Sequence, residues 1–196
     1  MKTLGNDSVK EEIITASQAV FQRYGYTRVS MQDISKECKK GRSTLYHYFN
    51  NKEEVLNAVC YKIFSKCLRE SEEAITKRKS FSANIEAFNA AKLKHLREMV
   101  HQYKLAIDDL RQDPSSFLIK LRAFAEDEIN VVKKIITWGV ENKDIVALQD
   151  EDIQFLAETL NAAFKSFEQE IIIFGRFPNY ENKVAWLAQM FHKGLL

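Results

Sequence analysis

The sequence predicts an all-α protein of about nine helices. Only six glycines and two prolines occur among its 196 residues, which favours long helices joined by few connections. Apolar residues recur three and four positions apart through most of the chain, the spacing of one helix face, and no segment alternates as a strand does. With 45% hydrophobic residues the chain can bury a core of substantial size.

The first two helices are defined by their end signals. The first is expected over about 7–24, with apolar residues in helical register and Gly25 as a C-terminal stop. Ser30 is placed to cap the second helix, because Asp33 follows three residues later in the position of the acidic partner of a capping box. Both helices would lie in the N-terminal third of the chain.

A short third helix near 42–49 and a longer fourth helix complete the N-terminal part. Asn51 can cap the fourth helix, and two glutamates follow in its first turn. This helix should run to the charged segment "TKRKS" at 76–80, which we take as the boundary between an N-terminal head and a C-terminal body.

Five further helices are expected in the body, over 82–103, 104–112, 114–141, 150–175 and 178–195. Their ends carry local signals. Asp113-Pro114 is a helix start, Asp150 can cap the following helix, and Gly175 can end it.

The helix at 42–49 has two unlike faces. At 100° per residue, Leu45 and Phe49 fall on one side and Tyr48 on its flank. The opposite side carries a cation, two hydroxyls and an imidazole, from Arg42, Ser43, Tyr46 and His47. Two short helices joined by a tight turn form a helix-turn-helix, whose second helix enters the DNA major groove. The polar side could therefore contact bases and phosphates.

Residues beside this helix could bind phosphate. Lys52 begins the fourth helix, and its charge would add to the unpaired amides there. Thr27 and Ser30, at the entry to the second helix, could bind phosphate from the other side.

The charge distribution agrees with a nucleic-acid partner. Residues 1–80 carry 15 Lys and Arg against 10 Asp and Glu, whereas residues 81–196 carry 14 against 17. A basic head on a mildly acidic body fits a polyanion such as DNA. The alternative is that "TLYHYF" is an amphipathic core helix with incidental tyrosines and that Lys52 is an ordinary surface charge, since aromatic stripes are usually core.

Residues 21–59, "FQRYGYTRVSMQDISKECKKGRSTLYHYFNNKEEVLNAV", resemble the DNA-binding head of the TetR family of bacterial transcriptional regulators. The shared signature is the exit "YGYT", the opening "SMQDI" and the closing "TLYHYFNNKEEVL". The resemblance implies a core role for Leu45 and Phe49. It implies DNA contacts by Thr27, Arg42, Ser43, Thr44, Tyr46, His47, Tyr48 and Lys52.

The turn departs from the family pattern. Where the family usually has Ala-Gly-Val-Ser, this chain has Cys38-Lys39-Lys40-Gly41, so the usual glycine is missing. Gly41 takes the place of the usual N-cap serine at a cost of only a few tenths of a kcal/mol. The two lysines could add affinity for phosphate.

In this family the body binds a small molecule and pairs with a second copy. The resemblance therefore implies a head at 1–53, a connecting helix at 54–80 and a ligand-binding and dimerisation body at 81–196. The expected function is a repressor that binds a palindromic double-stranded DNA operator as a homodimer and is released by a largely apolar effector. The alternative is a DNA-binding protein of this fold that a protein partner controls, or that acts structurally, without a small-molecule effector.

The residues expected to line an effector pocket are mostly apolar, with a few polar groups, as is usual for ligand sites. They are Phe88, Asn89, His95, Met99, Tyr103, Phe117, Leu121, Phe124, Glu128 and Trp138. Core packing is the competing role for each aromatic. His95, Glu98 and His101 share one side of a helix, but no further ligands with diagnostic spacing accompany them, so neither a metal nor a cofactor is expected.

The last two helices are the candidates for dimerisation. The expected interface residues are Ala157, Asn161, Lys165, Glu168, Trp186 and Met190. The competing role is closure of the monomer core, because interface cores resemble domain cores.

Two classes of protein are excluded by simple observations. No apolar run approaches the roughly 18 residues of a membrane span, and three cysteines without metal-type spacing indicate reduced thiols, so a cytoplasmic protein is expected. An enzyme is not expected, because the sequence shows no nucleophile–base pair, no glycine-rich phosphate loop and no paired metal ligands.

Overall fold

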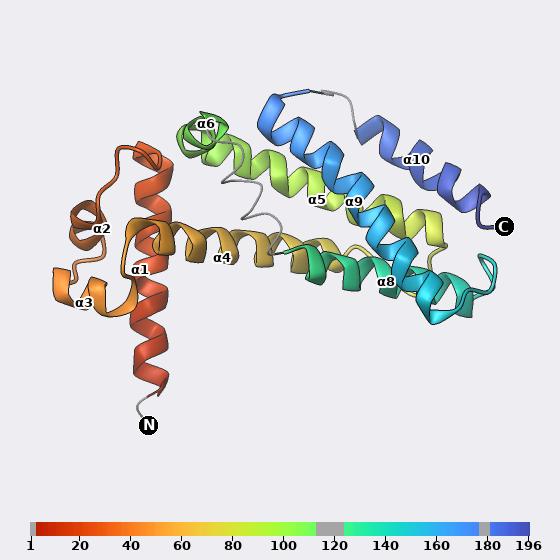
Figure 1. Cartoon of the computed structure of the whole chain (residues 1–196), viewed down its shortest axis with the longest axis horizontal. Helices are drawn as coiled ribbons and strands as arrows, with labels where there is room; N and C mark the ends of the chain where they lie inside the picture. Colours follow the sequence, from red (N-terminus) through yellow and green to blue (C-terminus); the bar gives the residue numbers. More distant parts are fainter. Residues whose placement is uncertain (1–2, 113–123, 177–180) are drawn as a thin grey trace. The chain divides into compact units, whose positions relative to one another are not determined.

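The computed structural model describes residues 3–112, 124–176 and 181–196. The described residues form helices throughout and no strand, which confirms the all-α prediction (Figure 1). In chain order the helices are α1 (Thr3–Tyr24), α2 (Met31–Glu37), α3 (Arg42–Tyr48), α4 (Lys52–Glu72), α5 (Phe81–Gln102), α6 (Lys104–Gln112), α8 (Ala125–Glu141), α9 (Asp150–Phe174) and α10 (Glu181–Lys193).

The chain divides into two compact units, and each unit is formed by two separate segments of the sequence. The first unit comprises Met1–Phe64 and Met99–Lys120, and the second comprises Ser65–Glu98 and Leu121–Leu196. Helix α6 therefore belongs to the same unit as α1, α2 and α3, although about 60 residues separate it from α3 in the sequence. The predicted ranges 1–53, 54–80 and 81–196 assign functions to the chain, and these assignments remain predictions.

The first unit owes its short helices to the end signals that the sequence carries. Gly25 ends α1 with a positive φ of 79°. At the start of α2, Ser30 and Asp33 form the expected capping box, and Asn51 Oδ1 accepts a 2.9 Å hydrogen bond from the amide of Glu54 at the start of α4. The core beneath these helices consists of Ile13, Ile14, Val20, Phe21, Val29, Ile34, Leu45, Phe49, Val55, Leu56 and Val59.

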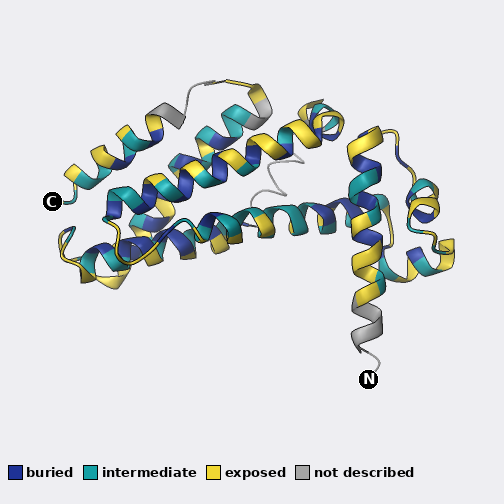
Figure 2. Ribbon diagram, turned by 180° about the vertical axis from the view of Figure 1, so that it is seen from behind, coloured by how far each residue is buried: buried dark blue, intermediate teal, exposed yellow. Residues whose placement is uncertain are grey.

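The second unit packs α5, α8, α9 and α10 around a separate core. Each helix has a buried and an exposed side (Figure 2). The largest fully buried side chains of this core are Phe81, Phe88, Ile85, Leu93, Ile135, Ile136 and Leu160. Gly139 on α8 lies so close to Ile145 and Phe81 that an added Cβ would be 3.2–3.3 Å from their side chains.

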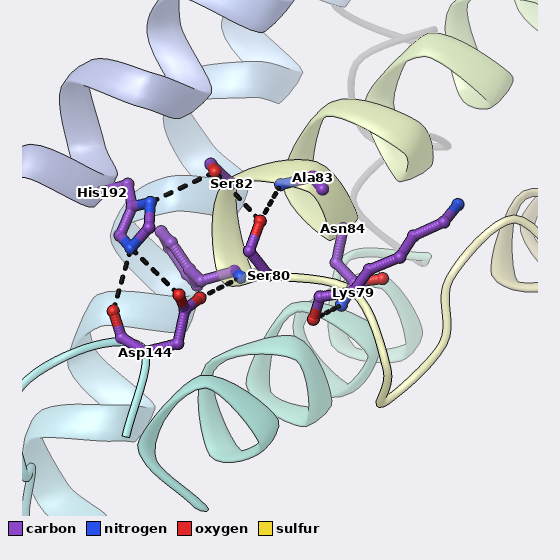
Figure 3. Close-up of polar contacts among 8 residues, drawn as sticks. Lys79, Ser80, Ser82, Ala83, Asn84, Asp144 and His192 are labelled. Carbon is purple, nitrogen blue, oxygen red and sulfur yellow. Dashed lines mark hydrogen bonds and ion pairs between the residues drawn. The ribbon is translucent and has the colours of Figure 1, made fainter. Parts of the chain in front are cut away.

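Polar groups connect the start of α5, the segment between α8 and α9, and α10 in the second unit (Figure 3). His192 on α10 lies 3.2 Å through Nδ1 from Ser82 Oγ and 2.9 Å through Nε2 from the backbone oxygen of Asp144. The Asp144 carboxylate accepts a hydrogen bond from the Phe81 amide at the start of α5. A serine, a histidine and an aspartate thus lie close together here. Their hydrogen bonds connect the start of α5 and the segment between α8 and α9 to α10.

Several helix ends differ from the prediction. Helix α1 begins at Thr3, before the expected residue 7, and α4 ends at Glu72, before the charged segment. Gln149 is the N-cap of α9, so Asp150 begins the helix and does not cap it. The expected start of a helix at Asp113-Pro114 lies outside the described residues.

None of the helices in the described parts of the chain is long and apolar enough to cross a bilayer.

Candidate nucleic-acid interface

Helices α2 and α3 are joined by a turn whose backbone is fixed from two sides. The Ser35 hydroxyl donates to the Lys40 carbonyl at 2.7 Å. The Lys40 ammonium lies 2.7 Å from the Glu12 carboxylate on α1, and this hydrogen bond raises the pKa of Lys40. Lys39 between them has a φ of 52°, in the left-handed region. The turn therefore forms without its usual glycine, and Lys40 is paired within the head.

Helix α3 presents the predicted polar face. Leu45 is fully buried and Phe49, its C-cap, is 4% exposed, so the apolar side packs against the core of the first unit. The side chains on the opposite face are exposed, namely those of Arg42, Ser43, Tyr46 and His47. An exposed tyrosine above a buried leucine is the orientation that the helical spacing predicts.

Two other predicted contact residues of α3 lie at the edge of this face. Thr44 and Tyr48 are half-buried. The ring of Tyr48 lies edge-on to the His47 ring, with 5.1 Å between their centroids. Tyr48 therefore supports the orientation of an exposed imidazole in addition to any contact of its own.

The loop between α1 and α2 contributes the other predicted residues. Thr27 and Ser30 are both exposed. The Ser30 hydroxyl lies 2.6 Å from Asp33 Oδ2 and caps α2, so it is already engaged within the protein. The backbone of Thr27 is held on both sides by residues of other helices.

Lys52 holds this loop from the side of α4. Its Nζ donates to the carbonyl oxygens of Tyr26 at 2.8 Å and Thr27 at 3.4 Å, and it lies 4.3 Å from the centroid of the Tyr26 ring. Burial lowers the pKa of Lys52, and the nearby Asp109 opposes this effect. The Lys52 ammonium is therefore engaged within the head, and the assignment of Lys52 as a phosphate contact remains a prediction.

Asp109 on α6 is the partner that the sequence did not indicate. Its Oδ2 accepts hydrogen bonds from the amides of Tyr26 at 2.7 Å and Thr27 at 2.8 Å. No local pattern could reveal this contact, because more than 80 residues separate its two sides.

The comparisons with known proteins agree with this geometry. Residues 13–59 match the family model described as "Bacterial regulatory proteins, tetR family". An HTH-type transcriptional regulator of Haemophilus influenzae is 31% identical over 181 residues, which cover 91% of this chain and 94% of that protein. The chain belongs to the TetR family. It is a transcriptional regulator with a helix-turn-helix, and not an enzyme.

Two further comparisons extend beyond the head of this TetR-family chain. The fatty acid metabolism regulator protein of Bacillus subtilis is 24% identical over 137 residues, which cover 68% of this chain and 69% of that protein. A transcriptional regulator from Cytophaga hutchinsonii shares the fold with a TM-score of 0.64 and 24% identity, over 94% of this chain and 97% of that one.

Not all of the residues predicted to line an effector pocket lie in the described parts of this TetR-family chain, and their role as pocket residues remains a prediction. Phe117 and Leu121 lie outside those parts. Phe88, Asn89 and Phe124 are buried in side-chain packing.

Met99 and Tyr103 line a small apolar cavity in the first unit. Its volume of about 30 Å³ is that of about one water molecule. Its other lining residues are Phe21, Leu56, Val59, Cys60, Ile63, Phe64, Ala106 and Ile107, from α1, α4 and α6.

His95 and Trp138 are only half-buried. His95 Nδ1 lies 3.5 Å from the Glu70 carboxylate, and the Lys134 ammonium lies 5.1 Å from the Trp138 ring centroid. Among the described residues, no group of three or more His, Cys, Asp or Glu side chains is arranged to hold a metal ion.

Glu128, predicted as a polar pocket group, belongs instead to a buried ion cluster of the second unit. The Lys92 ammonium on α5 lies 3.1 Å from Glu128 on α8 and 2.8 Å from Glu168 on α9. The Lys165 ammonium lies 2.6 Å from the other Glu128 oxygen. These four side chains, two cations and two anions, are at most 12% exposed and are called the buried quartet below.

The pKa values of the two acids in the buried quartet are shifted in opposite directions. Burial disfavours the charge of Glu128, but the two ammonium groups beside it outweigh burial and lower its pKa. Burial dominates at Glu168, where the charge of Glu128 adds to it, and the pKa of Glu168 is raised although Lys92 lies close. Burial also raises the pKa of the neighbouring Cys67 thiol to about 11.

The structure corrects the predicted dimer face of α9. Ala157, Asn161 and Glu168 are buried within the unit, and Lys165 belongs to the buried quartet. Helical spacing alone had placed them opposite the core. Trp186 and Met190 on α10 are 58% and 45% exposed, as an interface role requires.

Proposed function

We propose that this TetR-family protein is a homodimeric repressor that binds a palindromic operator and leaves it when a largely apolar effector binds. The observation that carries the proposal is the exposed polar face of α3, formed by Arg42, Ser43, Tyr46 and His47 above a buried Leu45. A helix with this face is the recognition element that a helix-turn-helix inserts into the major groove.

The side chains of α3 have complementary chemical roles. Arg42 can donate two hydrogen bonds to the edge of a guanine or bind a phosphate. Tyr46 and His47 each add a hydrogen-bonding group and a ring, which can contact a base, a sugar or a phosphate. Thr44, at the edge of this face, and Thr27, in the loop between α1 and α2, would bind the DNA backbone and fix the register of the head on the duplex.

The second copy would pair through α9 and α10. Large apolar side chains are exposed at Trp186 and Met190 on α10 and at Phe174 at the end of α9. Their exposure to water does not stabilise a monomer, whereas an interface would bury them. Trp is enriched among the residues that contribute most to interface affinity. A pair of heads related by twofold symmetry would require an operator with inverted half-sites.

The effector is expected to be apolar because the buried charges of the second unit are already neutralised. Lys92 and Lys165 are paired with Glu128 and Glu168, so in the described part of the body no buried cation remains for a multiply anionic ligand. The relative named a fatty acid metabolism regulator supports the same class of ligand. We also propose that the protein acts in the cytoplasm, where DNA and such a ligand are both present.

Selection of bound sequences from a random duplex pool tests the core of the proposal. An inverted repeat should be enriched, and its half-sites should lie on one face of the duplex. Replacement of Tyr46 by Phe should change the preference at particular base pairs. Enrichment of no sequence, or of a single half-site, would contradict the palindromic operator.

Light scattering tests the dimer. The wild type should have the mass of two chains, and the double variant Trp186→Ala/Met190→Ala should dissociate at a concentration where the wild type does not. Tyr61→Ala, at an equally exposed aromatic on α4, is the matched control and should leave the mass unchanged. Equal behaviour of the two variants would remove α10 from the interface.

Titration of ligands against the protein–operator complex tests the effector. A long-chain fatty acid should release the DNA, and a nucleoside triphosphate should not. The competing hypothesis, control by a protein partner without an effector, predicts neither release nor a thermal shift with lipophilic compounds. Release by the triphosphate alone would overturn the apolar effector.

A further inference from the structure

Two residues of the loop that joins α1 to α2, Tyr26 and Thr27, are held by opposite charges on two helices. The Asp109 carboxylate of α6 accepts hydrogen bonds from the amides of Tyr26 at 2.7 Å and Thr27 at 2.8 Å. The Lys52 ammonium of α4 donates to the carbonyl oxygens of the same two residues at 2.8 and 3.4 Å. The backbone of this short loop is therefore held on both its donor and its acceptor side.

Gly25 makes the approach of Asp109 possible. A Cβ at this position would lie 2.7 Å from Asp109 Oδ2 and 3.4 Å from Leu105. The backbone also has a positive φ of 79°, which residues with a side chain rarely adopt. The contact between α6 and the loop thus depends on a residue without a side chain.

The loop leads directly into the DNA-binding part of the head. Thr27 is itself a candidate DNA contact, and three residues later Ser30 caps α2. Hydrogen bonds from amides to a carboxylate are about twice as strong as bonds between neutral groups. Movement of the loop would move the start of α2 and, through the turn, α3.

We propose that Asp109 is a positioning residue for DNA binding. It touches no base or phosphate, and it acts by fixing Tyr26 and Thr27, so that the start of α2 is held in the position that the operator requires. The inference concerns the DNA-binding activity of the regulator and requires no effector.

The variant Asp109→Asn tests the proposal, with Asp108→Asn as its matched control. Asp108 is the preceding residue on α6, and its carboxylate lies 3.0 Å from Arg111 of the same helix. Both variants remove one negative charge from the first unit. The probes are the duplex that the wild type selects from a random pool and an unrelated duplex of equal length.

The loss of a negative charge and the loss of positioning should change the affinity for DNA in opposite directions. Loss of a negative charge alone should strengthen binding to both duplexes slightly, in both variants. Loss of positioning should weaken binding of Asp109→Asn to the selected duplex about tenfold or more, while Asp108→Asn keeps or gains affinity. Equal affinities of the two variants for the selected duplex would overturn the proposal. The selected duplex need not be an inverted repeat, so a failure of the dimer proposal is a separate result.

Amide hydrogen exchange separates positioning from a loss of stability. In the wild type, the amides of Tyr26 and Thr27 should be protected although they lie in a loop, and unprotected amides there would contradict the contact. In Asp109→Asn these two amides should exchange faster while those of α1 and α4 remain protected. If Asp109→Asn does not fold, Asp109→Glu keeps the charge but displaces the carboxylate, and full operator affinity of that variant would also overturn the proposal.

Discussion

Lys39 adopts a backbone conformation that its side chain disfavours. Its φ of 52° is left-handed, at the turn between α2 and α3 where glycine has no steric cost. The chain tolerates this because the turn is fixed by the Ser35 hydroxyl and by the ion pair of Lys40 with Glu12. A strained residue thus persists where its neighbours determine the backbone.

Lys39→Gly should therefore stabilise the head. The gain expected from relieved strain, less the added freedom of the unfolded chain, is about 0.5–1 kcal/mol in the free energy of unfolding. Urea denaturation measures it. Lys36→Gly, in the right-handed last turn of α2, is the control and should cost about 1 kcal/mol. Destabilisation by both substitutions would show that Lys39 is not strained.

Gly25→Ala should have the opposite effect at the end of α1. The positive φ and the 2.7 Å approach to Asp109 together should cost about 1–3 kcal/mol in the free energy of unfolding. In an Asp109→Ala background the clash is absent, so the same substitution should cost less, and a double-mutant cycle measures the difference. Equal costs in both backgrounds would mean that the close approach contributes nothing.

At the scale of the element, α3 separates stability from recognition across its two faces. It is one of the shortest of the described helices and ends at Tyr48, so its position depends on packing rather than on its own stability. Leu45 and Phe49 provide this packing from one face. The other face can carry side chains suited to DNA contact because it contributes little to the core.

Leu45→Ala and Tyr46→Phe should therefore have different consequences. Leu45→Ala should lower the free energy of unfolding by about 2–5 kcal/mol, because the side chain is fully buried. Tyr46→Phe should change stability by less than about 0.5 kcal/mol and should weaken operator binding roughly fivefold, through one lost hydrogen bond. Thermal denaturation and a DNA titration give the two quantities. A folded Leu45→Ala protein that fails to bind DNA would reverse the assignment of the faces.

At the scale of the whole molecule, the two compact units are stabilised by different means. The first unit joins its helices through an apolar core and end caps. The second has an apolar core as well, but the buried quartet connects α5, α8 and α9 inside it. Four buried charges with zero net charge are stable only as a complete set, because removal of one leaves another unpaired.

Lys92→Met should destabilise the protein by about 3–5 kcal/mol near pH 7, since Glu168 loses its cation. Urea denaturation at several pH values measures this deficit. Lys94→Met, at an exposed lysine on the same helix, should be nearly neutral. Addition of Glu168→Gln to Lys92→Met should restore part of the loss.

The pH dependence of this deficit follows from Glu168. Its pKa is already raised by burial, and loss of Lys92 should raise it further, so the folded variant takes up a proton before the unfolded chain does. The deficit should thus shrink as the pH falls from 7 toward about 5. Glu128 behaves oppositely in the wild type. Its lowered pKa stabilises the protein above the unfolded value of about 4.3, and this stabilisation is lost as the pH falls through the folded pKa. A deficit that does not change between pH 7 and 5 would contradict the role of Glu168.

The sequence by itself determined the helices, the capping box of Ser30 with Asp33, the stop at Gly25 and the two faces of α3. These features depend on residues within a few positions of one another, so they can be recognised directly from local patterns such as helical periodicity. It also carried the signature that indicated the TetR family.

Only the tertiary structure decided which partner each helix face meets. Periodicity showed that α9 has a second face at Ala157, Asn161 and Lys165, but not that this face is buried in the unit. It could not pair Lys92 with Glu128, or Asp109 with the loop after α1, because these groups come together through packing of helices far apart in the sequence. A helix face is a local property, whereas its neighbour is decided by the packing of the whole unit.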